Sequence, residues 1–286
     1  MKKFPAIIPV ITVLVGMPVM FSVASAIDRQ IPVISKDEAA KTSKQPPTPA
    51  LKGEHAPVHR QTSWFYVGEG AAHHWGDVDQ SYAACKTGQS QSPINISRAV
   101  ATEELNDLDP QYQAVPLNIL NNGHTIHVDL EKGGHALINS KRYRLVQMHF
   151  HTPSEHYIDG APYAMEAHLV HADEQGQLAV VGIMLKLGEH QNPAIEKIWA
   201  ALPGKPHEQT LSDTLFSASE ILPANLADYR YDGSLTTPPC SEQVSWHVLK
   251  QPVEISRDQL VRFQMLFPVN ARPIQPLNGR QVKTRQ

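Results

Sequence analysis

Residues 145–151, Leu-Val-Gln-Met-His-Phe-His, alternate between apolar and polar side chains. Successive side chains of a β-strand point to opposite faces, so this pattern predicts a strand with one buried apolar face. The other face then carries Gln147, His149 and His151. Two histidines at this spacing lie about 6 to 7 Å apart along the strand, close enough to bind one metal ion. This strand therefore constrains both the fold and the site.

A second histidine-rich stretch, Glu-Ala-His-Leu-Val-His, follows the strand. As a strand it places Glu166 and His168 on one face and His171 on the other, whereas as a helix it places the two histidines together. A chain reversal at 159–160, an Asp-Gly pair, predicts an antiparallel hairpin with His168 directly opposite His151. The hairpin favours the strand, and the strand selects His168 over His171.

Three neutral imidazoles, from His149, His151 and His168, would form an open zinc site with a fourth position for water. A metal-bound histidine usually donates its second ring N–H to an acceptor. Gln147 and Glu166 each lie two residues from a predicted ligand on the same strand face, so we expect them to accept those N–H groups. The alternative is a solvated polar face, because an isolated histidine is more often structural than a ligand.

The first 60 residues predict targeting and linking segments. Residues 1–26 contain two lysines, an apolar run at 6–21 and Ala-Ser-Ala at 24–26, which together predict a removable signal peptide. A membrane anchor is the competing interpretation, because the apolar run approaches a spanning length. Residues 27–60 are rich in Pro and Lys and predict a flexible linker. Residues 61–286 remain for one domain with a sizeable core.

Charge and cysteine content narrow the class of protein. The formal net charge of −3 becomes −5 once the basic leader is removed, and no basic patch stands out, so we expect no nucleic-acid partner. Cys85 and Cys240, in an exported chain, predict one disulfide. Two buried free thiols are the alternative.

The remaining patterns predict many strands and few helices. An Asn-Asn-Gly turn at 121–123 predicts a hairpin, Asn192-Pro193 predicts a helix start, and Ser256 to Gln259 predict a capping box. Residues 229–240, rich in Gly, Thr and Pro, predict a loop. The fold class is mainly β (α+β by a strict count), in a single domain with a few short peripheral helices.

Several motifs together resemble the α-class carbonic anhydrases, of the bacterial, exported type. They occur in the order of that family from Trp64 to about Arg280, which is nearly the whole predicted domain. The motifs are QSPINI, NNGH at 121–124, QMHFH, SEH at 154–156, EAHLVH, LAVVGI, GSLTTPPC at 233–240, VSWHVLK and NARP at 270–273.

The resemblance implies a twisted, mostly antiparallel sheet with zinc at the base of a conical cleft. His149, His151 and His168 match the zinc ligands. Zinc lowers the pKa of its bound water to about 7, for which carbonic anhydrase is the standard example. The resemblance implies that the resulting hydroxide attacks CO2 and gives bicarbonate and a proton.

The resemblance also assigns roles around the zinc. Thr236 matches the threonine that orients the hydroxide and passes its own hydrogen to Glu155, and Thr237 matches a residue that contacts bicarbonate. His124 matches the histidine that exports the proton. The apolar CO2 pocket corresponds to Val170, Val180, Leu235 and Trp246. His156 and Tyr231 match a hydrogen-bonded pair near Glu166.

The resemblance implies a periplasmic or secreted enzyme with a Cys85–Cys240 disulfide, no stable membrane anchor after signal cleavage, and a homodimer as a plausible assembly. Two alternatives are a non-catalytic binding module of the same fold and a zinc-dependent ester hydrolase. The complete set of three histidines argues against the first alternative. The absence of a specific acyl pocket argues against the second.

Overall fold

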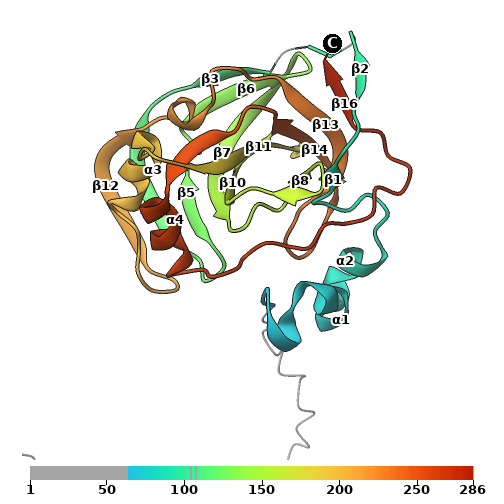
Figure 1. Ribbon diagram of the computed structural model, residues 1–286, viewed down its shortest axis with the longest axis horizontal. Coiled ribbons are helices and arrows are strands. Elements are labelled where there is room, and N and C mark those ends of the chain that lie inside the picture. Colours follow the sequence, from blue (N-terminus) through green and yellow to red (C-terminus); the bar gives the residue numbers. More distant parts are fainter. Residues whose placement is uncertain (1–63, 104, 107, 286) are drawn as a thin grey trace, which may run out of the picture. The chain divides into compact units, whose positions relative to one another are not determined.

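The chain folds around one large twisted sheet bordered by short helices (Figure 1). The computed structural model describes residues 64–285 except 104 and 107. The predicted signal peptide at 1–26, the whole of the predicted linker at 27–60 and the predicted start of the domain at 61 lie outside these residues. Within the described part, strands far outnumber helices and the helices are short, so the mainly β fold class is confirmed.

The elements have the following bounds. The strands are β1 Asn95–Ile96, β2 Val100–Thr102, β3 Asp109–Tyr112, β4 Val115–Asn121, β5 Ile126–Asp129, β6 Gly134–Ile138, β7 Lys141–His151, β8 Tyr157–Ile158, β9 Ala161–Pro162, β10 Met165–Ala172, β11 Leu178–Gly188, β12 Gln209–Phe216, β13 Asp228–Ser234, β14 Glu242–Leu249, β15 Val253–Ser256 and β16 Lys283–Arg285. The α-helices are α1 Trp75–Val78, α2 Ala84–Thr87, α3 Pro193–Trp199 and α4 Arg257–Gln264, and the 3-10 helices are Gly68–Gly70, Ala72–His74, Gln80–Tyr82 and Ala218–Ile221.

The main sheet runs in the order β12-β4-β5-β7-β10-β11-β14-β13-β16-β2. Most neighbours, including β5, β7, β10 and β11, pair antiparallel as expected. The strand β11 pairs parallel with both β14 and β15. A parallel pair needs a long crossover, and the segment that contains α3, β12 and β13 provides it between β11 and β14.

The apolar face of β7 is held by the helices. Met148 and Phe150 are fully buried in the larger apolar cluster. The Phe150 ring packs edge-on against Trp199 of α3, with ring centroids 4.8 Å apart, and lies 6.1 Å from Phe263 of α4. Burying such a side chain stabilises the fold by about 1.5–3 kcal/mol. The polar face of β7 is thereby fixed in the opposite direction.

Both predicted helix starts are confirmed. The Asn192 side chain accepts hydrogen bonds from two backbone N–H groups of α3, and Pro193 is the first helical residue. Ser256 and Gln259 form the reciprocal capping box of α4. Gln259 also accepts from the Asn192 backbone N–H at 2.9 Å, which joins the starts of the two helices.

The register of β10 on β7 differs from the prediction. His168 lies opposite His149, and Glu166 lies opposite His151, two residues from the expected pairing of His168 with His151. The chain does reverse at 159–160, but that turn belongs to the separate small hairpin of β8 and β9. More residues separate β7 from β8 than separate β9 from β10, so the register shifts. A shift of two retains the strand face, and the strand prediction for His168 is confirmed.

The predicted loop at 229–240 is wrong in its first half. Residues Asp228–Ser234 form β13, which pairs antiparallel with β14 and β16. Tyr229 and Tyr231 alternate with polar residues and pack against the smaller apolar cluster. Pairing on both sides therefore outweighs the local preference of a Gly- and Asp-containing sequence for a loop.

The predicted disulfide is confirmed. Cys85 and Cys240 are bonded with a Cα–Cα distance of 5.0 Å, so the alternative of two free thiols is wrong. The bond links α2 to the loop that follows β13. Within the described residues, we find no helix with the length and apolar character needed to cross a membrane.

Candidate metal centre

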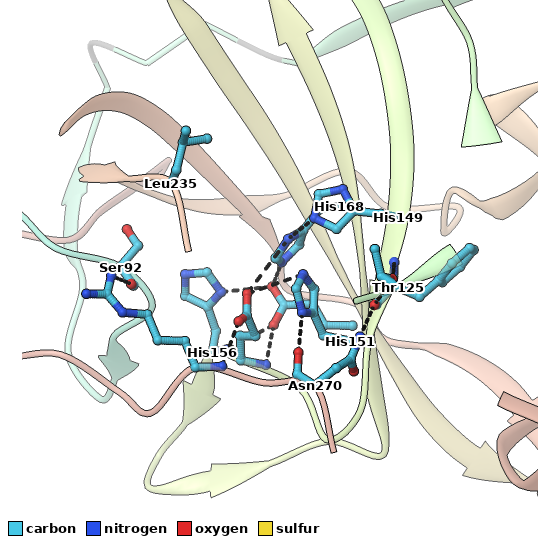
Figure 2. Close-up of polar contacts among 12 residues, drawn as sticks. Ser92, Thr125, His149, His151, His156, His168, Leu235 and Asn270 are labelled. Atoms are coloured by element: carbon cyan, nitrogen blue, oxygen red, sulfur yellow. Dashed lines mark hydrogen bonds and ion pairs between the residues drawn. The ribbon is translucent and has the colours of Figure 1, made fainter. Parts of the chain in front are cut away.

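Three histidines from neighbouring strands point toward one another (Figure 2). His149 and His151 come from β7 and His168 comes from β10. Their candidate ligand atoms all lie within 4.8 Å of one another. His151 and His168 are buried, whereas His149 is partly exposed. The strand alternation and the observed register produce this convergence.

Each of the three imidazoles holds one ring nitrogen against an oxygen acceptor. The partners of His149 Nδ1 and His168 Nε2 are Gln147 Oε1 and Glu166 Oε1, both at 2.9 Å. His151 Nδ1 donates to the backbone carbonyl of Asn270 at 2.7 Å. An oxygen acceptor requires an N–H on the nitrogen that faces it, so the lone pair of each neutral ring is on the other nitrogen.

These lone pairs converge, and the residues fit a metal ion. His149 Nε2 and His168 Nδ1 are 3.3 Å apart although both are acceptors in these tautomers. His151 Nε2 has no hydrogen-bond partner among the described residues. Burial lowers the pKa of all three histidines, that of His151 to about 4, so the rings are neutral as metal ligands must be. Three imidazoles are a known open set for zinc.

Glu166 is the centre of a second, hydrogen-bonded group. It accepts from His168 Nε2 at 2.9 Å, from His156 Nδ1 at 2.8 Å, and from the backbone N–H groups of Glu155 and His156 at 2.9 and 2.8 Å. Burial favours its protonation, but His156 and His168 hold its pKa well below the ordinary value. The Tyr231 hydroxyl lies 2.6 Å from His156 Nε2. Because its oxygens already accept these four donors, Glu166 orients His168 rather than holding a second metal.

Glu155 and Thr236 lie beside the three histidines. Glu155 Oε2 is 3.4 Å from His151 Nε2, and Glu155 Oε1 accepts from the backbone N–H of Arg272 at 2.8 Å. Burial raises the pKa of Glu155 to about 7, against the lowering effects of His168, the Arg272 N–H and a hydrogen bond from the Thr236 hydroxyl. The Glu155 carboxyl group thus lies between Thr236 and the backbone of Arg272, in the irregular segment that follows α4.

The predicted pocket residues belong to one apolar group. Val170, Val180 and Trp246 lie in the smaller apolar cluster, and Leu235 packs against it. The ring centroids of Trp246 and His168 are 4.9 Å apart, so this cluster borders the candidate metal centre at His168. Thr237, in the loop after β13, accepts the backbone N–H of Cys240 with its carbonyl at 2.8 Å.

His124 lies in the turn between β4 and β5. Its imidazole stacks on Trp64, with ring centroids 3.8 Å apart and an interplanar angle of 8°. The side chain is partly exposed. Burial, assisted by His207, lowers its pKa. The ring therefore has access to solvent and is neutral near pH 7.

Sequence reasoning assigned no role to three residues that support this site. Asn270 provides the acceptor for His151, Arg272 holds Glu155, and Trp64 stacks on His124. The NARP motif contains the first two and was the available signal. His171, as predicted, is turned away: its Nε2 lies 2.7 Å from the Tyr112 hydroxyl.

Comparison with known families agrees with this geometry. Residues 70–286 match the family described as eukaryotic-type carbonic anhydrase. The chain belongs to the α-class carbonic anhydrases. A carbonic anhydrase from Nostoc is 40% identical over 233 residues, which cover 79% of this chain and 88% of that protein.

Solved carbonic anhydrases share the fold. The α-carbonic anhydrase from Thermovibrio ammonificans, solved with the inhibitor sulfanilamide, is 42% identical, with a TM-score of 0.75 over 78% of this chain and 99% of that chain. Among the sequence relatives, a dioscorin from Dioscorea polystachya is 32% identical over 218 residues, covering 73% of this chain and 80% of that protein.

Proposed function

We propose that this carbonic anhydrase catalyses the zinc-dependent, reversible hydration of CO2 to bicarbonate and a proton. The observation that carries the proposal is the set of three converging lone pairs on His149, His151 and His168, each fixed by an oxygen acceptor on the other ring nitrogen. A zinc ion held there would lower the pKa of a ligated water, the effect for which this family is the standard example, so that hydroxide is available near neutral pH.

Thr236 and Glu155 orient the nucleophile. We expect the ionised form of Glu155, whose pKa Thr236 helps to lower, to accept the Thr236 hydroxyl hydrogen. The Thr236 oxygen can then only accept a further hydrogen bond. A nucleophile that donates to Thr236 must direct its lone pair away from that hydrogen and toward the substrate. The Arg272 backbone N–H donates to Glu155 Oε1 at 2.8 Å, which holds the Glu155 side chain in place.

The substrate pocket follows from apolar packing. Val170, Val180, Leu235 and Trp246 present hydrocarbon and aromatic surface beside the histidines. An uncharged, linear molecule such as CO2 suits this surface, because it needs no charged partner. Thr237 adjoins Thr236 and offers polar contact to the bicarbonate product.

His124 exports the proton. Its ring is partly exposed, and its lowered pKa leaves it neutral and able to accept a proton near pH 7. Trp64 supports the ring by stacking at 3.8 Å. This stacking restrains the His124 imidazole within the turn between β4 and β5.

The chain acts outside the cytoplasm, in the periplasm or as a secreted protein. The Cys85–Cys240 disulfide supports this, since structural disulfides persist in oxidising compartments. The signal peptide at 1–26 and the homodimer remain predictions, to be tested by N-terminal sequencing and sedimentation of the mature protein.

The test is CO2 hydration by the purified mature protein, measured with zinc content and with sulfanilamide. We expect about one zinc per chain and rapid hydration that sulfanilamide inhibits. A folded protein without zinc, or with zinc and no hydration, would contradict the proposal and favour a binding module.

A further inference from the structure

A serine, a histidine and an aspartate form a hydrogen-bonded row away from the candidate metal centre. Ser245 and His247 alternate with Trp246 on β14, so they lie on the opposite face from the metal pocket. Ser245 Oγ is 3.2 Å from His247 Nε2, and His247 Nδ1 is 2.7 Å from Oδ2 of Asp228. Asp228 comes from the paired strand β13, which lies beside β14 (Figure 1).

The direction of each hydrogen bond follows from the carboxylate. His247 and Arg230 hold the pKa of Asp228 below its ordinary value although burial favours protonation. An ionised carboxylate only accepts, so His247 Nδ1 carries the hydrogen and Nε2 has the lone pair. Ser245 therefore donates its hydroxyl hydrogen to His247. A nucleophile donating to a base, with the base oriented by a third group, is the arrangement that activates serine.

Only the serine is reachable from solvent. Asp228 is 2% exposed and His247 is 0% exposed, whereas Ser245 is partly exposed. Ser245 lines a surface cavity of about 670 Å³ together with Lys141, Gln177, Asp232 and Glu242. A small molecule in this cavity would meet the hydroxyl with the base already behind it.

The cavity charges restrict the ligand. Asp232 and Glu242 contribute two carboxylates, and the ammonium of Lys141 is already paired with Asp173. An anionic substrate is therefore disfavoured. The lining also carries side-chain donors, the type of group that stabilises a developing oxyanion: Ser90, Lys141, Gln177 and Gln243.

We propose that Ser245, His247 and Asp228 form a second, metal-independent site that transfers the acyl group of small uncharged esters to water. Ser245 Oγ bonds to the ester carbonyl carbon while its proton passes to His247 Nε2. The bond from that carbon to the alkoxy oxygen then breaks, and the His247 proton leaves with the alcohol. Water, activated by the same nitrogen, cleaves the acyl-serine, releases the acid and restores the hydroxyl.

Two probes on the full mature chain test this site: 4-nitrophenyl acetate, before and after metal removal with dipicolinate, and a fluorophosphonate followed by peptide mass spectrometry. The fluorophosphonate reacts when Ser245 Oγ bonds to phosphorus and fluoride leaves, so it reports the nucleophile without any substitution. We expect phosphonylation of Ser245. We also expect ester hydrolysis that survives metal removal and falls about 100-fold in Ser245→Ala.

Ser81 provides the matched control, because its hydroxyl donates to Asp79 at 2.6 Å and no histidine takes part in that hydrogen bond. It should remain unlabelled, and Ser81→Ala should leave hydrolysis unchanged. Thermal unfolding of each variant verifies folding. An unlabelled Ser245 in the natural chain overturns the proposal, as does hydrolysis that disappears with the metal or is unaltered in folded Ser245→Ala.

Discussion

Histidines on the two faces of the sheet differ in the contacts of their second ring nitrogen. On one face, His149, His151 and His168 each have one nitrogen on an oxygen acceptor and direct the other toward a shared point. On the other face, His247 has both nitrogens engaged, with Asp228 and Ser245. His151, His168 and His247 are all buried, so burial does not separate the two regions. The free, convergent nitrogen is what distinguishes a metal ligand from a histidine within a hydrogen-bonded row.

The largest difference should appear between two alanine variants of β10, one at the predicted ligand His168 and one at the non-ligand His171. His168→Ala removes one converging nitrogen, so we expect zinc affinity to fall by more than about 100-fold and CO2 hydration to be lost. His171→Ala, three residues along and on the other face, should retain zinc. Elemental analysis of both folded variants measures this. Loss of zinc in His171→Ala with retention in His168→Ala would reverse the assignment of faces.

His124→Ala should lower turnover about 100-fold in dilute buffer, the lower range for a general acid–base group. Added imidazole should restore it, and His190→Ala, whose side chain is 87% exposed, is the control. Because the pKa of His124 is lowered, its neutral, proton-accepting form persists below pH 6.5, and its contribution is lost as the pH falls through that lowered value. Turnover independent of buffer would exclude this role.

Thr236→Ala should reduce kcat/KM by about 10- to 100-fold while zinc content is unchanged, because the hydroxyl orients the nucleophile rather than holding the metal. Steady-state kinetics beside zinc analysis separate the two effects. The exposed Thr214→Ala serves as the comparison. A variant with normal kinetics, or one that loses zinc, would contradict the orienting role.

Asp228→Asn, on the opposite face, should leave CO2 hydration unchanged and affect stability instead. It removes the charge that Arg230 and His247 share, and breaking such a buried pair costs about 3–5 kcal/mol. The folded-state pKa of Asp228 is lowered, so its contribution is complete above about pH 4 and is lost as the pH falls through the lower value.

Urea unfolding at pH 7 and thermal unfolding at acidic pH measure the Asp228→Asn effect. The difference from the natural chain should narrow at low pH. Asp77→Asn, which removes an exposed pair with Lys86, should cost less than about 1 kcal/mol. Equal stability of the natural chain and Asp228→Asn at pH 7 would show that the buried pair contributes nothing.

Local pattern predicted much of this molecule. Alternation around Phe150 predicted β7, Asn192 and Ser256 predicted the helix starts, and the hydrogen bonds of His149 and His168 involve residues two positions away on the same strand. Each of these depends on neighbours in sequence. The prediction of the strand face of His168 was right although the predicted register was two residues off, because strand faces repeat every two residues.

Contacts between distant segments were not predictable in the same way. The acceptor for His151 is a backbone carbonyl 119 residues away at Asn270. The donor to Glu155 is the backbone N–H of Arg272. Backbone groups are the same in every residue, so no side-chain pattern marks them. Only the NARP motif of the family indicated that this segment belongs beside the site.

The most direct test is a crystal structure of the purified protein with anomalous diffraction data collected at the zinc edge. We predict one strong peak about 2.0–2.1 Å from His149 Nε2, His151 Nε2 and His168 Nδ1, with the acceptors Gln147, Asn270 and Glu166 still engaged. A peak on His171 or His247, or a folded protein with no peak at the three histidines, would contradict the account.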